Sequence, residues 1–119
     1  MKFLTITSGL FLCSLVTTYA QNAQKDIIIY GSYHINKIMP LGKAKIYVNL
    51  KNNSKSDYKD ITYRVKFIAG DGTEEGGTNL TLHDFIGPGV SKKMKDQYVD
   101  CPRDCNAISF SIVSGKKLD

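Results

Sequence analysis

Apolar residues recur at every second position through most of the chain beyond residue 25. Two stretches, 44–51 and 60–69, show this most clearly, and their alternating apolar members are Ile46, Val48, Leu50, Ile61, Tyr63, Val65 and Phe67. A period of two is that of a β-strand with one buried face, and no window shows the longer period of an amphipathic helix. The pattern therefore predicts antiparallel sheets that bury one face and leave the other in water.

Further strands are predicted at residues 26–33, 77–85, 90–99 and 107–114, and the continuous apolar run of the first predicts a strand covered on both sides. Turn residues separate the strands, with Asn and Ser at 52–58, Gly-Asp-Gly at 70–72 and Gly-Pro-Gly at 87–89. Six or seven short strands with such spacing are typical of an immunoglobulin-like sandwich. We therefore expect an all-β fold, a single antiparallel sandwich over residues 26–114, with short tails at 21–25 and 115–119.

The first twenty residues have the plan of a secretory signal peptide. Lys2 supplies a positive start, an apolar run follows to Val16, and Thr18 and Ala20 give small residues before a cleavage site at Gln21. An alternative is a lipoprotein signal in which Cys13 carries the lipid. Either way the protein is expected to be exported, to the periplasm, the cell surface or the medium, with no membrane span in the remaining chain.

Charge and cysteine usage agree with export. The chain carries a net charge of +5, which becomes +4 once Lys2 is removed, and the charges are dispersed rather than clustered. This distribution makes nucleic acid an unexpected partner. Cys101 and Cys105 remain after the signal peptide is removed, and an even pair in an oxidising compartment predicts a disulfide that pins the loop between them. Reduced thiols are the alternative.

Two surfaces are candidate binding sites. If the strands at 44–51 and 60–69 form a hairpin, their outward residues make one basic ladder around an exposed tyrosine, consisting of Lys45, Tyr47, Lys51, Arg64 and Lys66. Such a ladder suits an anionic glycan, a lipid headgroup or an acidic protein, and it equally describes an ordinary solvated sheet face. The second candidate is the apolar loop with Met39 and Leu41, which could insert into a partner or plug the end of the sandwich.

The sequence offers no catalytic constellation. His34 and His83 have no partner at metal-ligand spacing, and no nucleophile elbow or phosphate-binding loop is present. Asp71, Glu74 and Glu75 cluster in a turn without the alternating oxygen pattern of a calcium loop. No catalytic residue, metal site or cofactor is predicted, and a small-molecule substrate is not expected.

The succession of strands and turns resembles the FxLYD domain of bacterial exported proteins. The residues that carry the resemblance are AKIYVNLKNNS at 44–54, DITYRVKFIAGDGTEEG at 60–76, HDFIGPGVSKKM at 83–94 and AISFSIVSGK at 107–116. Phe67 and Asp71 occupy the first and last positions of the eponymous motif. The resemblance implies a small β-sandwich on a secreted or cell-envelope protein, and it implies no catalytic residues.

The expected function is that of a non-enzymatic exported binding module, which recognises a protein or a cell-envelope component through a sheet face or a loop. The alternative is an accessory subunit of a larger envelope assembly that pairs through an edge strand, with residues 26–33 as that edge. A small secreted inhibitor or enzyme is the third and least favoured interpretation.

Overall fold

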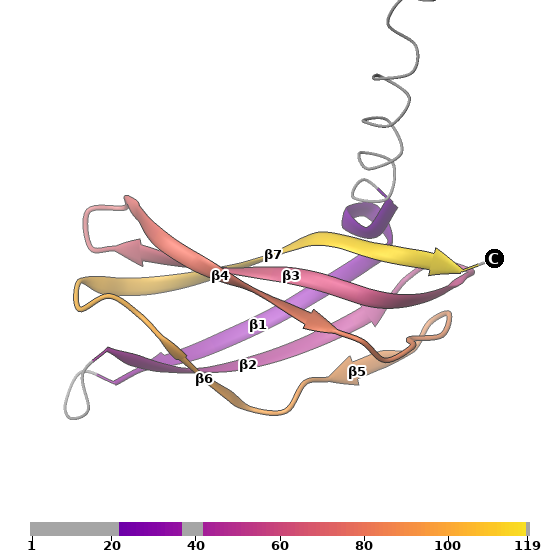
Figure 1. The fold of residues 1–119 in the computed structure, drawn as a ribbon, viewed down its shortest axis with the longest axis horizontal. Coiled ribbons are helices and arrows are strands. Elements are labelled where there is room, and N and C mark those ends of the chain that lie inside the picture. Colours follow the sequence, from indigo (N-terminus) through magenta and orange to yellow (C-terminus); the bar gives the residue numbers. More distant parts are fainter. Residues whose placement is uncertain (1–21, 37–41, 119) are drawn as a thin grey trace, which may run out of the picture.

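Seven β-strands in two antiparallel sheets form the part of the chain that the computed structural model describes, residues 22–36 and 42–118. In the first sheet β2 (Lys43–Asn52) lies in the centre, with β1 (Ile27–Ile35) on one side and β5 (Ser91–Lys93) and β6 (Gln97–Asp100) on the other. In the second sheet β3 (Asp57–Ala69) lies between β4 (Glu74–Leu82) and β7 (Cys105–Leu118). The two sheets form a sandwich (Figure 1), so the predicted all-β antiparallel fold is confirmed.

The core fills the space between the two central strands. β2 buries Ala44, Ile46, Val48 and Leu50, and β3 buries Tyr58, Ile61, Tyr63, Val65 and Phe67. Every buried residue of β2 is separated from the next by one outward-facing residue, as the alternation predicts. Burying a side chain such as Leu50 contributes about 1.5–3 kcal/mol to stability, which fixes the register of the central strands.

Asn52 connects the two sheets at the point where the chain leaves β2. Its side chain is fully buried, and its amide nitrogen donates hydrogen bonds to the carbonyl oxygens of Ser56 (2.6 Å) and Ile86 (2.8 Å). Its amide oxygen accepts hydrogen bonds from the backbone N–H of Ser54 (3.0 Å) and from the Ser54 hydroxyl (2.7 Å). The predicted turn at 52–58 and the predicted corner at 86–89 are therefore tied together by one side chain.

β2 and β3 do not pair, although the sequence suggested a hairpin. The chain crosses from the first sheet to the second between Asn52 and Asp57, because Asn52 bonds the turn to the Ile86 corner and does not let the chain fold back along β2. This correction separates residues that the hairpin would have brought together.

The ends of the chain are more structured than predicted. Residues 22–26 are helical, although 21–25 were expected as a tail and residue 26 as the start of a strand, and Ala23 is fully buried against the core. The Tyr58 hydroxyl donates a hydrogen bond of 2.5 Å to Asp26 at the end of this turn. Residues 115–118, also expected as a tail, continue β7, since Lys116, Lys117 and Leu118 pair with the start of β3.

Two strand predictions need correction. Residues 26–33, expected to be covered on both sides, give the edge strand β1, and Tyr30 on it is 56% exposed. Residues 90–99 give two short strands, β5 and β6, which are separated by residues 94–96, where Met94 is buried and its N–H donates to the carbonyl of Val48 (2.8 Å). Val90, expected to point inward, is 49% exposed.

The edges of the described sheets are formed by β1, β5 and β6 in the first sheet and by β4 and β7 in the second. β1 lies alongside β7, and the Phe110 ring packs on Gly31, where an added Cβ would come within 2.3 Å of the ring. β4 contains a bulge opposite Lys66 and Ile68, and Gly76 in it has a positive φ of 120°. The predicted signal peptide, Cys13 and the apolar loop with Met39 and Leu41 lie outside the described residues.

Candidate functional site

The predicted basic ladder is divided between the two sheets. Lys45, Tyr47 and Lys51 lie on the outer face of β2, whereas Arg64 and Lys66 lie on the outer face of β3 in the other sheet. The assumption that all five share one surface was wrong, because it required the hairpin that the fold does not form. The binding role of either group stays a prediction.

New neighbours join Lys45 and Tyr47 on the first sheet. In the antiparallel register, Tyr30 of β1 lies opposite Asn49 and His34 lies opposite Lys45. On the other side of β2, Tyr98 lies opposite Lys45 and Lys93 lies opposite Asn49. Directly opposed residues on one face of a sheet are close enough to interact. We call this surface the tyrosine–lysine face and define it by Tyr30, His34, Lys43, Lys45, Tyr47, Asn49, Lys51, Lys93 and Tyr98.

Lys45 lies at the centre of the tyrosine–lysine face. Its ammonium is 5.3 Å from the centroid of the Tyr47 ring and 5.8 Å from that of Tyr98, within the range of a cation–π contact. Its Nζ is also 3.6 Å from a carboxylate oxygen of Asp96. Tyr47 and then Tyr98, with a smaller contribution from Asp96, hold the pKa of Lys45 above its ordinary value. Lys45 therefore stays protonated at neutral pH.

The other lysines of this face differ in their partners. Lys43 forms an ion pair with Asp100, and both side chains are well exposed. Lys51 and Lys93 make no ion pair with any described residue. The tyrosine–lysine face thus presents a moderate positive charge, in which some cations are already balanced by carboxylates.

Two hollows indent the tyrosine–lysine face. The first has a volume of about 270 Å³ and is lined by Tyr30, Gly31, Ser32, Tyr47, Val48, Asn49 and Lys93. The amide oxygen of Asn49 is shielded from solvent and has no hydrogen-bond partner among the described residues. The second has a volume of about 530 Å³ and is lined by His34, Asn36, Lys43, Lys45 and Tyr98. Both are open to solvent.

Sequence reasoning missed Tyr30, Tyr98 and Lys93 as members of one surface. Tyr30 was assigned to a strand covered on both sides. Tyr30, Ser32 and His34 occupy every second position of this strand, and this was a signal that one of its faces is polar. Tyr98 and Lys93 come from two short strands that share one neighbour, β2, and no local pattern in the sequence reveals that pairing.

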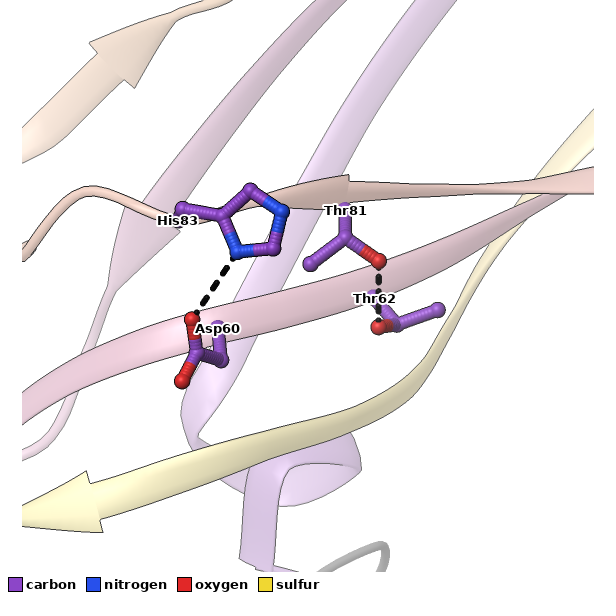
Figure 2. Close-up of polar contacts among 4 residues, drawn as sticks. All are labelled: Asp60, Thr62, Thr81 and His83. Atoms are coloured by element: carbon purple, nitrogen blue, oxygen red, sulfur yellow. Dashed lines mark hydrogen bonds and ion pairs between the residues drawn. The ribbon is translucent and has the colours of Figure 1, made fainter.

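The outer face of the second sheet carries paired polar side chains (Figure 2). His83 Nδ1 lies 3.1 Å from a carboxylate oxygen of Asp60, and the hydroxyls of Thr62 and Thr81 share a hydrogen bond of 2.8 Å. Asp60 has a positive φ of 51°, which Asp tolerates better than most residues. His83 is 80% exposed, and Asp60 is its one side-chain partner in the described chain. These contacts lie at the open end of the hairpin, where they link the first residues of β3 to the last residues of β4 and to His83.

Arg64 on this sheet is occupied by its neighbours. Its guanidinium donates a hydrogen bond of 3.0 Å to the amide oxygen of Asn79 and lies 3.9 Å from a carboxylate oxygen of Glu74. A positive charge held in this way is less available to a partner than the unpaired Lys51 and Lys93. The geometry therefore favours the first sheet over the second as a binding surface.

The loop between β6 and β7 is not closed by a disulfide in the structure. Cys101 and Cys105 are both buried as thiols, and the Cys105 Sγ lies 3.3 Å from the carbonyl oxygen of Ala107. The turn is held by backbone bonds, in which the Cys105 N–H donates to the carbonyl of Pro102 (3.0 Å) and the Cys101 N–H donates to that of Gly42 (2.8 Å). The predicted disulfide is thus not part of this structure.

No group of three or more His, Cys, Asp or Glu side chains in residues 22–36 and 42–118 is placed to hold a metal ion. Within the same residues, no helix combines the length and the apolar character that crossing a bilayer requires.

Comparison with known proteins identifies a distant structural similarity. No protein-family model matches the sequence, and no curated protein matches it significantly. Among solved structures, the chain is similar to the X-ray structure of Northeast Structural Genomics Consortium target SoR45, with a TM-score of 0.49 and 10% sequence identity. The alignment covers 81% of this chain and 88% of that one. The resemblance to FxLYD domains stays a prediction.

Proposed function

We propose that the protein is a non-enzymatic exported binding module whose tyrosine–lysine face recognises an anionic component of the cell envelope. The observation that carries this proposal is the position of Lys45, whose ammonium lies near the half-buried ring of Tyr47 and the exposed ring of Tyr98, in a face with two hollows, one of which Lys45 lines. Tyrosine rings provide rigid contact area at low entropic cost, and lysines attract negative charge. The signal-peptide plan of residues 1–20 supports export.

The edges of the sheets support recognition through a face rather than through strand addition. Strand addition needs a long, regular and accessible edge. β4 is interrupted by a bulge, and β5 and β6 are only three and four residues long. The two long edge strands, β1 and β7, contact each other through Gly31 and Phe110. Short, bulged and charged edges are features that discourage edge-to-edge pairing.

Co-sedimentation of the exported protein with isolated envelope material tests the proposal. Lys45→Glu places a negative charge at the centre of the face, and we expect it to weaken binding by about tenfold, equivalent to about 1.4 kcal/mol. Lys116→Glu makes the same charge change at an exposed position of β7 and serves as the matched control. Binding should also weaken as salt rises. Equal binding of both variants and the unaltered protein would overturn the proposal.

A further inference from the structure

We infer that the tyrosine–lysine face accommodates one chain of an acidic polysaccharide, with a sugar carboxylate in the hollow at Lys45 and a neutral part of the chain over the hollow at Asn49. This inference rests on the proposed function and specifies its ligand. The two hollows lie along the same strand, and Lys45 and Asn49 are separated by about 14 Å at the rise of an extended strand. A linear polymer can therefore occupy both.

The hollow at Asn49 suits a ligand that carries both polar groups and a flat apolar face. Asn49 and Lys93 contribute polar side chains to its lining. The amide oxygen of Asn49 has no hydrogen-bond partner among the described residues and is itself shielded from solvent, so a ligand donor reaches it once the Asn49 side chain turns towards the hollow. Tyr30, which is 56% exposed, and Tyr47 add flat apolar surfaces beside it. A sugar ring offers both hydroxyl groups and an apolar C–H face, whereas a headgroup such as phosphoserine has no ring to stack on the tyrosines.

The hollow at Lys45 suits a ligand group with a single negative charge. Lys43, Lys45 and His34 surround it, and Tyr98 closes one side with a ring that is 71% exposed. Asp96 and Asp100 balance part of this charge, since they pair with Lys45 and Lys43. A polymer with one carboxylate on each sugar unit fits this balance. The dense negative charge of a polyphosphate or a nucleic acid fits it less well, because both aspartates would repel it.

A peptide is a poorer fit for the same surface. Extended peptides bind to β-proteins chiefly by adding to a free edge, through main-chain hydrogen bonds. The tyrosine–lysine face has no edge at its centre, because the backbone groups of β2 are bonded to β1 on one side and to β5 and β6 on the other. Side chains alone face the ligand here, which suits a polymer recognised by its ring faces and hydroxyls.

Binding of the exported protein to polygalacturonate, compared with the same polymer after reduction of its carboxyl groups, tests the inference. We expect the reduced polymer to bind at least about tenfold more weakly, because the Lys45 hollow then lacks its charged partner. Tyr98→Ala and Asn49→Leu should each weaken polygalacturonate binding by about three- to tenfold. Phe85→Ala removes an aromatic ring that is 61% exposed on the other side of the fold and should leave binding unchanged.

The outcomes separate the inference from the proposed function. Equal binding of native and reduced polymer, or stronger binding of a single-stranded oligonucleotide or of anionic vesicles, overturns the polysaccharide ligand. If envelope binding remains sensitive to Lys45→Glu and polygalacturonate does not bind, the inference fails and the proposed function stands. If Lys45→Glu has no effect on envelope binding, the proposed function fails as well. Circular dichroism of each variant excludes misfolding as the cause.

Discussion

Asn52 is the residue on which the connection of the two sheets depends most. Its side-chain amide makes four hydrogen bonds while fully buried, and its backbone N–H and carbonyl bond to Val90 (3.0 Å) and Gly89 (2.7 Å). Asn is a common turn residue, and the sequence pattern predicted a turn here. It could not predict burial, because the partner at Ile86 is far away along the chain.

Replacing this amide should destabilise the protein strongly. We expect Asn52→Ala to lower the free energy of unfolding by about 2–4 kcal/mol, because it removes four side-chain hydrogen bonds at a buried position, two of them to the carbonyls of Ser56 and Ile86. Chemical denaturation measures the change. Asn53→Ala, at the exposed neighbouring position, should stay within about 0.5 kcal/mol of the unaltered protein. Similar effects of the two substitutions would contradict the role assigned to Asn52.

Tyr63 should make stability depend on alkaline pH. Burial raises the pKa of its phenol above the ordinary value of 10.0, and a hydrogen bond with the Gln97 side chain opposes this only in part. As pH rises past about 10, the unfolded chain releases this proton before the folded chain does, so stability is full below that pH and is lost above it.

Denaturation at a series of alkaline pH values measures this loss. One such group contributes at most about 1.4 kcal/mol per pH unit to the slope. Tyr63→Phe should therefore reduce the slope, while Tyr98→Phe, at an exposed position, should not. An unchanged slope in Tyr63→Phe would show that another group governs alkaline unfolding.

At the scale of elements, alternation predicted the central strands and failed at the edges. β2 and β3 are buried on one face and wet on the other, so their sequences carry a clear period of two. β1 was misjudged because its isoleucines at 27–29 read as a fully buried run, while in the structure Ile28 and Ile29 are only half-buried. Which strands become neighbours depends on contacts distant in sequence, and this is why the shared surface of Tyr30, Lys45 and Tyr98 could not be foreseen.

The contact between β1 and β7 should be sensitive to a single added methyl group. A Cβ at Gly31 would lie 2.3 Å from the Phe110 ring, so Gly31→Ala forces the two strands apart and should cost about 1–3 kcal/mol of stability. Thermal unfolding measures the loss, and Gly31→Ala combined with Phe110→Leu should recover part of it. Gly70→Ala is the matched control, because an added Cβ there meets no atom within 4 Å. Equal losses at both glycines would refute the proposed close contact.

At the scale of the whole molecule, the sequence predicts the sandwich architecture, and the tyrosine–lysine face is identified only from the structure. The sandwich follows from alternation and turn residues, whereas the tyrosine–lysine face is assembled from four strands that lie on both sides of β3 and β4 in the chain. The same residues could not have been grouped by spacing, because Tyr30 and Tyr98 are brought together only by their common neighbour β2.

The first residue of the exported protein can be predicted from the sequence. The signal-peptide plan of residues 1–20 leads us to expect that the exported protein begins at Gln21, since Ala20 ends the predicted cleavage site. Intact-mass measurement of protein recovered from the envelope or the medium checks this. A lipid-modified chain beginning at Cys13 would instead support the lipoprotein alternative, and an unprocessed chain would contradict both.

The tyrosines of the tyrosine–lysine face also give the protein an intrinsic optical probe. The chain contains seven tyrosines and no tryptophan, so its near-ultraviolet fluorescence comes from tyrosine alone. Tyr30, Tyr47 and Tyr98 belong to the tyrosine–lysine face, and two of them contact the ammonium of Lys45. A ligand that covers this face should change their emission and near-ultraviolet circular dichroism. Binding can therefore be followed on the unlabelled protein, with Tyr58 and Tyr63 as buried rings that report whether the fold is intact.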